Sequence, residues 1–365
     1  MKRHNWLKKH TLGLAAALLV TAGMSQIALA GDSVYVNTSS LRYRTSAQIK
    51  DNNIAGNLSY GQKLERVGTS GQWTMILLNG KKYYVSSAYV TSKKPASAGA
   101  VQTTSQTAAG AQTSGGTAIA LSSNYKYANY SKINSGTATL YRSTASNKKN
   151  KVVCVNAGHG TNGGGSVKTQ CHPDGSAKVT GGTTGAGATS AVAVSSGMTF
   201  ADGTAESKVT LAMAKVLKTK LLNAGYDVLM IRESDDVQLD NIARTVIANN
   251  NADCHIALHW DSTSSNKGAF FMSVPSNATY RAMEPVASHW KQHNQLGESL
   301  ISGLKSAGVK IYSKGSMEMD LTQTSYSTIP SVDIELGDKA SDHSGATLET
   351  LANGLLAGVN IFFGQ

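Results

Sequence analysis

Two histidines and one glutamate in this 365-residue chain have the residue types and positions of a catalytic metal site. His159 and His259 each follow a short apolar run, and Glu206 stands at the start of a strongly periodic helical segment. Two histidines and a carboxylate commonly bind catalytic zinc and leave one coordination position open for water. The sequence therefore predicts a metal-dependent hydrolase in which His159, Glu206 and His259 bind the metal.

The apolar runs before the two histidines indicate how these side chains come together. Residues 151–156 and 254–258 are short and apolar, and a polar residue ends or follows each run, which is typical of buried parallel strands. Ligands of open α/β sheets gather at the carboxyl ends of such strands. Further strands are expected at residues 226–231, 269–273 and 332–336, and they alternate with amphipathic helices. This alternation predicts an α/β fold with a mostly parallel sheet flanked by helices.

Helical spacing decides where Glu206 points. It lies three and seven positions before Val209 and Met213, so it shares the buried stripe at the amino end of its helix. The positive end of the helix dipole favours a carboxylate there. A simple first-turn glutamate is the alternative, and the two strand-end histidines favour the metal ligand.

Glu335 is the candidate for the catalytic base. It lies near the end of the strand expected at 332–336, on the same strand face as Asp333 by parity. Metal-assisted hydrolysis needs a base that takes the proton of water and returns it to the leaving amine. Asp333 and Asp338 are rival candidates, and either could instead be a solvated carboxylate at the strand end.

Residues 1–30 have the pattern of a signal peptide. A basic start precedes an apolar run from Leu12 toward Ala22, and Ala28-Leu29-Ala30 then predicts cleavage after Ala30. The alternative, a retained membrane anchor, would need about 20 apolar residues, and the uninterrupted run is shorter. No later segment is expected to be apolar enough to span a membrane. We therefore expect a secreted protein that is soluble or associated with the cell wall.

The mature chain is basic. The full sequence has 34 Lys and Arg against 22 Asp and Glu, and removal of residues 1–30 takes away four basic residues and no acidic ones, which leaves +8. A basic exported protein is attracted to anionic surfaces such as teichoic acids or acidic lipids. Nucleic acid is not expected as a partner, because the charge is scattered rather than gathered in a basic run with aromatic residues.

The three cysteines cannot form a disulfide framework, and their odd number leaves at least one thiol free. Cys154 and Cys254 each precede a candidate ligand histidine by five positions, so their thiols are expected on the strand face opposite that histidine. We expect buried apolar thiols, and a bond between these two cysteines is the alternative.

Residues 31–91 form a compact β-rich unit. Asn79-Gly80 between two apolar runs predicts a two-residue hairpin turn. The unit resembles a bacterial Src-homology-3-like domain, and the matching stretches are residues 36–42, 71–73 and 84–90. The resemblance implies a small barrel that binds the peptide part of peptidoglycan. A spacer barrel without binding activity is the alternative.

Residues 92–121 have almost no large apolar side chains and consist mainly of Ser, Thr, Ala, Gly and Gln, so they predict a flexible linker. Residues 122–150 follow as a pre-catalytic segment that contains several tyrosines and a possible strand at 137–141. The sequence leaves open whether this segment packs on the domain that follows.

Residues 151–365 resemble the zinc-dependent N-acetylmuramoyl-L-alanine amidases of bacterial cell walls. The matching stretches run in the order of that family: Gly158-His159-Gly160, Glu206, residues 225–232 with Asp235, Arg244 with Ala248-Asn249 and Ala252-Asp253, residues 256–259, and residues 330–337. Position by position, the resemblance implies His159, Glu206 and His259 as zinc ligands and Glu335 as the catalytic glutamate.

Three features depart from the family pattern. Asn156-Ala157 stand where the family usually has Asp-Pro, and Asp261 stands where it usually has Asn. Asp261 could bond to a ligand or a substrate amide, or alter the charge at the metal. Residues 161–203 form a Gly-, Thr- and Ser-rich insertion, expected either as a loop at the mouth of the active site or as a disordered excursion.

The remaining histidines and two arginines are expected in supporting roles. His255 is expected to be packed in the sheet, and His172 in the insertion is a minor candidate ligand. Arg232 and Arg244 are expected to pair with carboxylates such as that of Asp235. Three further histidines are expected on helix surfaces or in loops: His289, His293 and His343.

Together these features predict an exported, monomeric autolysin with peptidoglycan as its partner and zinc as its cofactor. The enzyme would cleave the amide between N-acetylmuramic acid and L-alanine with zinc-activated water, and Glu335 would transfer the proton. Two alternatives remain, which are a zinc peptidase that cuts the stem peptide and an inactive wall-binding protein. The second alternative is made plausible by Asn156 and Asp261.

Overall fold

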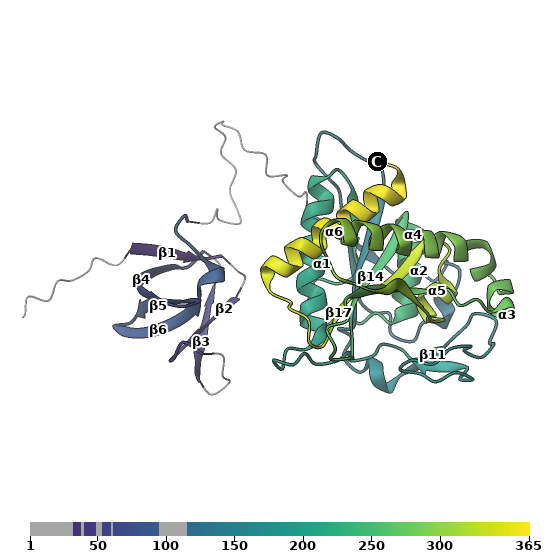
Figure 1. The fold of residues 1–365 in the computed structure, drawn as a ribbon, viewed down its shortest axis with the longest axis horizontal. Coiled ribbons are helices and arrows are strands. Elements are labelled where there is room, and N and C mark those ends of the chain that lie inside the picture. The colour runs from purple at the N-terminus through teal and green to yellow at the C-terminus, as the bar shows by residue number, and fades with distance from the viewer. Residues whose placement is uncertain (1–31, 38–39, 49–52, 60, 95–114) are drawn as a thin grey trace, which may run out of the picture. The chain divides into compact units, whose positions relative to one another are not determined.

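The computed structural model describes residues 32–37, 40–48, 53–59, 61–94 and 115–365. The chain divides into two compact units, Met1–Thr107 and Ala108–Gln365, and each has its own sheet (Figure 1). The predicted signal peptide at 1–30 and residues 95–114 of the predicted linker lie outside the described residues.

The amino-terminal unit is an antiparallel seven-stranded sheet in the order β3-β2-β6-β5-β4-β1-β7. Its core consists of small and branched apolar side chains that alternate along the strands: Val34, Val36, Leu41, Leu58, Leu64, Ile76 and Val85. The predicted hairpin is confirmed, because Leu78 pairs with Lys81 and both turn residues, Asn79 and Gly80, have positive φ. The strands are β1 (Asp32–Val36), β2 (Ser40–Arg44), β3 (Ile54–Ser59), β4 (Lys63–Ser70), β5 (Trp73–Leu78), β6 (Lys81–Ser86) and β7 (Val90–Thr91).

The carboxy-terminal unit is an α/β fold around an eight-stranded sheet. In spatial order the strands are β16 (Ile311–Glu318), β15 (Ala269–Ser273), β17 (Ser331–Asp338), β14 (Cys254–Asp261), β10 (Val152–Ala157), β13 (Asp227–Met230), β9 (Thr137–Tyr141) and β8 (Thr117–Ala120). The central strands β17, β14, β10 and β13 are parallel, as predicted. The sheet as a whole is mixed, because β9 and β8 add an antiparallel hairpin at one edge and β15 runs antiparallel to β17.

Helices cover both faces of this sheet (Figure 1). The main core is formed with α1 (Glu206–Asn223), α4 (Val286–Ser306) and α6 (Gly345–Phe363), which contribute Leu217, Leu300 and Leu355. On the other face lies α2 (Asn241–Asn251), which contacts α5 (Thr322–Tyr326). The short helix α3 (Ala278–Ala282) packs against α4.

Among the helices of the described residues, α6 alone is long and apolar enough to cross a membrane, by length and composition only. The expectation that no segment after residue 30 is apolar enough was therefore wrong for this helix. Its apolar stripe has a structural role, since Leu348, Leu351, Leu355 and Val359 are buried in the main core of the unit.

The cysteines are buried and unbonded, as expected. Cys154 packs on the α2 face of the sheet, whereas Cys254 belongs to the main core on the opposite face. These opposite positions follow from the parallel register, in which Cys154 pairs with His255 and not with Cys254. Cys154 and Cys254 therefore do not form the disulfide bond that was the alternative.

Residues 117–141 pack within the carboxy-terminal unit. Residues 117–120, which the sequence places at the end of the linker, form β8 and pair with β9. Tyr127 and Tyr130 pack edge to face on Tyr326, with ring centroids 5.5 Å and 5.4 Å away. The aromatic side chains of the segment therefore serve as its anchor, a role that its isolated sequence does not reveal.

Candidate metal centre

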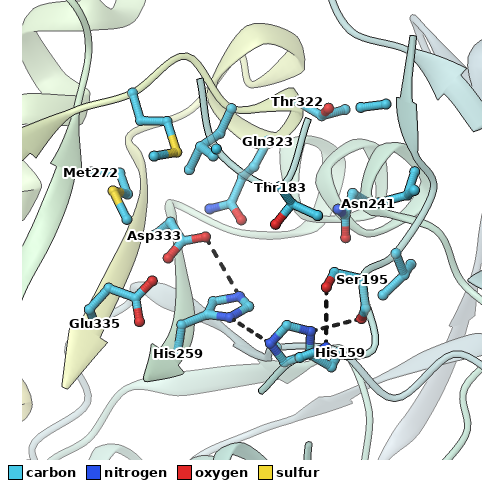
Figure 2. A pocket seen from close by; sticks show the side chains of 18 of the residues that line it. His159, Thr183, Ser195, Asn241, His259, Met272, Thr322, Gln323, Asp333 and Glu335 are labelled. Carbon is cyan, nitrogen blue, oxygen red and sulfur yellow. Dashed lines mark hydrogen bonds and ion pairs between the residues drawn. The ribbon is translucent and has the colours of Figure 1, made fainter. Parts of the chain in front are cut away.

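The ends of two adjacent parallel strands bring the candidate ligands together. Ala157 at the end of β10 pairs with Leu258 of β14, so His159 and His259 emerge at the same edge of the sheet. Glu206 is the first residue of α1, which packs on both strands. The sequence-predicted set therefore meets at one place, and Figure 2 shows the two imidazoles side by side.

Three ligand atoms of this set lie in mutual contact. The Nε2 atom of His159 is 2.8 Å from Oε1 of Glu206 and 3.0 Å from Nδ1 of His259. This Nδ1 atom is 3.1 Å from Oε1 of Glu206. Tetrahedral zinc with ligands at about 2.0–2.2 Å needs donor atoms roughly 3.3 Å apart, so a small expansion of the triangle would accommodate the ion.

Hydrogen bonds fix the orientation of two of these side chains. The Nδ1 atom of His159 lies 2.8 Å from the carbonyl oxygen of Ser195, and donation to that oxygen leaves the lone pair of Nε2 facing the triangle. The carboxylate of Glu206 accepts hydrogen bonds from the backbone N–H of Met198 at 2.8 Å and of Trp260 at 3.0 Å. These bonds hold donor atoms in position without occupying the space between them.

Glycine is required beside the imidazoles. A Cβ atom at Gly158 would lie 2.3 Å from Cε1 of His259, and one at Gly197 would lie 2.8 Å from Oε2 of Glu206. Gly197 also has φ +82°, a conformation that L side chains rarely adopt. The close approach of backbone to ligand side chains thus explains both glycines.

The charges of the site favour a cation at its centre. Burial opposes ionisation of Glu206, but hydrogen bonds from His159 and His259 hold the pKa of this carboxyl well below its usual range. Burial also opposes protonation of His259, whereas Asp333 and Glu206 together raise its pKa to about 10. The surrounding carboxylates therefore stabilise positive charge at this position, which is what a metal cation supplies.

Two buried arginines hold the loop that carries His159. Arg232 donates from Nε to the carbonyl oxygen of Ala157 at 3.0 Å, and Arg244 donates from Nη2 to that of His159 at 2.6 Å. In the described part of the chain their hydrogen bonds go to carbonyl, hydroxyl and amide oxygens. The expected pairing with carboxylates such as that of Asp235 was therefore wrong, since backbone carbonyls at the strand end take that place.

Asn156 connects one of these arginines to a buried histidine. Its Oδ1 atom accepts from Nη1 of Arg244 at 3.2 Å, and its Nδ2 atom lies 3.1 Å from Nε2 of His255. His255 is fully buried, as expected, and burial together with Arg244 lowers its pKa to about 3. The asparagine therefore bridges a cation and a neutral imidazole beneath the site.

Two carboxylates on β17 lie on the side of His259 that faces away from His159. Glu335 pairs with His259 in the strand register, and Asp333 lies two residues earlier on the same face (Figure 2). The Oε2 atom of Glu335 and the Oδ1 atom of Asp333 are buried and have no hydrogen-bond partner among the described residues. Burial raises the pKa of both groups, and in Glu335 the neighbouring Asp333 adds to this effect.

The other two carboxylate candidates are engaged elsewhere. Asp338 accepts hydrogen bonds from the backbone N–H groups of Ser265 at 3.0 Å and Lys267 at 3.2 Å. Asp261 forms an ion pair with Lys267 at 2.6 Å and bonds to Thr263. Asp261 therefore lines the site as a neutralised group, not as a free charge next to the candidate ligands.

The candidate ligands open into a cavity of about 440 Å³. Both β17 carboxylates line it, together with apolar side chains of the outer strands and of the turn before α5: Met272, Met317, Met319 and Leu321. The insertion at 161–203 contributes Thr183, Val192 and Ser195 to the opposite wall. The two labelled residues of this wall, Thr183 and Ser195, lie across the cavity from the carboxylates in Figure 2.

The insertion is ordered and is anchored by one buried carboxylate. It contains the antiparallel pair β11 (Lys168–Gln170) and β12 (Ser190–Val192). Asp320, which is fully buried, contacts Lys178 Nζ at 3.0 Å and accepts from the backbone N–H of Val179 at 2.7 Å. The expected loop at the mouth of the site agrees with this arrangement.

The remaining histidines have structural partners. His172 contacts Asp320 at 3.0 Å and Ser176 at 2.9 Å, away from the candidate ligands. His293 is buried and accepts a hydrogen bond from the backbone of Ser331, so the expectation of a surface or loop position was wrong for it. His343 pairs with Asp202 in a loop at 3.3 Å.

Comparison with known proteins identifies the family of this chain. The family model of N-acetylmuramoyl-L-alanine amidases matches residues 153–354, which is more than half of the chain. The chain therefore belongs to the N-acetylmuramoyl-L-alanine amidase family, whose substrate is peptidoglycan. The comparison with curated proteins found no match.

Solved structures of three amidases are similar to this chain. Ami1 from Mycobacterium smegmatis has 20% identity and TM-score 0.46, covering 60% of this chain and 99% of that one. The enzyme from Clostridium difficile 630 has 16% identity and TM-score 0.42, covering 59% and 97%. AmiC2 of Nostoc punctiforme has 15% identity and TM-score 0.42, covering 60% and 99%. These values add no detail to the family assignment.

Proposed function

We propose that this protein is a zinc-dependent amidase that cleaves the bond between N-acetylmuramic acid and L-alanine in peptidoglycan. The observation that carries the proposal is the triangle of donor atoms from His159, Glu206 and His259, with sides of 2.8, 3.0 and 3.1 Å. Two nitrogen donors and one oxygen donor suit zinc, and their side-by-side arrangement leaves the cavity side open to a substrate.

His159, Glu206 and His259 would hold the zinc ion. A zinc ion held there would polarise a carbonyl oxygen and would lower the pKa of bound water to about 7. The donation from His159 to Ser195 keeps one imidazole nitrogen available, and the two backbone N–H donors keep the carboxylate of Glu206 aimed at the triangle. The metal site is thus preorganised by groups that do not themselves bind metal.

Glu335 is the proposed base that takes the proton of water and delivers it to the departing alanine nitrogen. Its Oε2 atom is buried without a partner, so a proton on this oxygen displaces no existing hydrogen bond. Burial raises its pKa well above the usual range, which suits a group that must hold a proton during the reaction. Asp333 fits this role less well, because it contacts His259 at 3.6 Å on the side away from the other two ligands.

The amino-terminal unit is proposed to be a Src-homology-3-like wall-binding domain. Its antiparallel sheet and buried core support a small β domain, and the predicted linker would let it tether the catalytic unit to the wall. Export through the predicted signal peptide, attraction to anionic wall polymers and a monomeric state belong to the same proposal.

Two alternative functions are considered for this site. A zinc peptidase with this site would cut a bond within the stem peptide instead of the bond to muramic acid. An inactive wall-binding protein would bind peptidoglycan and cut nothing. The membership in the amidase family favours the proposed bond over the first, and the three converged donor atoms favour an active site over the second.

Digestion of purified cell walls tests the proposal, with end-group analysis and metal content measured together. The wild type is expected to contain zinc and to expose new amino-terminal L-alanine without new reducing sugar ends. Glu335→Gln is expected to retain zinc and to lose about 10²- to 10⁴-fold in rate. Glu298→Gln, at an exposed position on α4, is the matched control and should keep the wild-type rate.

Each contrary result has a distinct meaning. New amino termini other than L-alanine would support the stem-peptidase alternative. Wall binding without new ends, unaffected by Glu335→Gln, would support the inactive protein. A zinc-free wild type that still releases L-alanine ends would contradict the metal mechanism.

A further inference from the structure

The two candidate ligand histidines turn opposite nitrogens toward the centre of the triangle. His159 presents Nε2, whereas His259 presents Nδ1. A neutral imidazole binds metal through the nitrogen that carries no proton, so the second nitrogen must carry it. Each ring therefore needs an acceptor on its outer side to select the correct tautomer.

His159 has such an acceptor in the Ser195 carbonyl oxygen, 2.8 Å from its Nδ1 atom. On the outer side of His259, the Nε2 atom faces the carboxylate of Asp333, with 3.6 Å between Nε2 and Oδ2. Figure 2 shows the ring of His259 between Asp333 and His159. A shift of about 0.6 Å would turn this ion-pair contact into an ordinary hydrogen bond.

The carboxylate of Asp333 is mostly buried and faces His259. Its side chain is 16% exposed, and its Oδ1 atom is buried without a hydrogen bond. Its strand partner on β14 is Ala257, and the cavity wall nearby includes Met272. Among the ion pairs of the described residues, the only one that Asp333 makes is to His259. A mostly buried carboxylate is costly unless a neighbour uses its charge.

We propose that Asp333 is a positioning residue that accepts the Nε2 proton of His259 and thereby fixes Nδ1 as the metal-binding nitrogen. The inference rests on the proposed zinc site and names the residue that orients one of its ligands. A carboxylate behind a ligand imidazole also increases the basicity of the donor nitrogen, so its loss weakens metal binding. Asp333 acts through His259 and does not contact the reacting atoms.

Zinc affinity, measured by competition with a chromophoric chelator, tests this role without reference to catalysis. Asp333→Val removes the acceptor and is expected to weaken zinc binding about 10- to 100-fold. Asp333→Asn keeps one acceptor oxygen and should lose less, which a merely structural role would not predict. Asp202→Asn is the matched control, since Asp202 also pairs with an imidazole Nε2 atom, that of His343 at 3.3 Å, and is not among the residues that line the cavity.

The tautomer of His259 provides a second readout, through long-range ¹H–¹⁵N NMR correlations of the zinc-loaded protein. The wild type is expected to carry the ring proton on Nε2, and Asp333→Val to show a mixture of states. Zinc affinities of both Asp333 variants within about twofold of the wild type, with an unchanged tautomer, would overturn the inference alone. A wild type that binds no zinc would overturn the proposed function and this inference together.

Discussion

Asp320→Asn is expected to release the insertion from the wall of the cavity. Asp320 is fully buried and receives charge-assisted contacts from Lys178 at 3.0 Å and His172 at 3.0 Å. The backbone N–H groups of Val179 and Thr180 add donors at 2.7 Å and 3.0 Å. The amide variant keeps the shape of the side chain but removes the charge that compensates the buried ammonium.

The magnitude follows from the burial of Lys178, whose side chain is only 8% exposed. Removal of one partner from a buried ion pair costs about 3–5 kcal/mol, because the remaining charge loses its compensation. Hydrogen bonds to a charged group contribute about 1.5–3 kcal/mol each, and these contributions overlap with the ion pair. We therefore expect the docked insertion to lose about 3–5 kcal/mol, enough to open it in part of the population.

Hydrogen exchange of residues 172–187 with urea denaturation measures this loss. Asp174→Asn is the matched control, because Asp174 is an exposed carboxylate in the same insertion that bonds mainly to Ser176. Equal exchange and equal unfolding free energy in the two variants would refute the reasoning.

The contacts of Asp320 also determine how the docking of the insertion depends on pH. Burial opposes the ionisation of Asp320, yet hydrogen bonds from His172 and its other donors hold its pKa well below the usual range. A depressed folded-state pKa contributes stability above the unfolded value of about 3.9 and loses it as the pH falls toward the folded value. The insertion should therefore stay docked in mild acid.

Three further predictions concern the metal centre and its support. Gly158→Ala should weaken zinc binding at least about tenfold in chelator competition, because its Cβ atom would lie 2.3 Å from Cε1 of His259. Zinc at 100 times its Kd should stabilise the wild type by about 2.7 kcal/mol in thermal denaturation, and His159→Ala should abolish that gain. Arg244→Met should lower the unfolding free energy in urea by roughly 3 kcal/mol or more, because several buried carbonyl oxygens lose their donor.

The strands and the candidate ligands were predictable because their signals are local. The apolar run before His159 forms β10 and the run before His259 forms the first part of β14, and the parity of each strand fixes which side chains share a face. The mixed edges of the sheet were not predictable, since the direction of β15 and the hairpin of β8 and β9 depend on partners far along the chain.

The helix α4 was difficult to predict from the sequence for a different reason. Its buried face includes the small residues Gly297, Ser299 and Gly303 between Leu296, Leu300 and Leu304. Glycine is needed because a Cβ atom at Gly297 would lie 2.2 Å from Phe271, and one at Gly303 would lie 2.3 Å from backbone of α6. Close packing of the helix therefore puts small residues at buried positions where a sequence pattern is read from large apolar ones. The anchoring role of Asp320 could not be predicted from the sequence either, because its partner Lys178 lies 142 residues away.

The insertion reaches the metal centre through a part that does not depend on Asp320. Ser195 holds His159, and the backbone before it is tied to α2 and to the start of the insertion by Asn241 N–H to Ala193 O at 3.1 Å and Val194 N–H to Gly164 O at 3.3 Å. Loss of the Asp320 contacts should therefore disturb the cavity wall around Thr183 while His159 stays oriented. In kinetics on soluble wall fragments, Asp320→Asn should raise KM and leave the zinc Kd unchanged. A fall in zinc affinity that parallels the rise in KM would show instead that the insertion docks as one rigid piece.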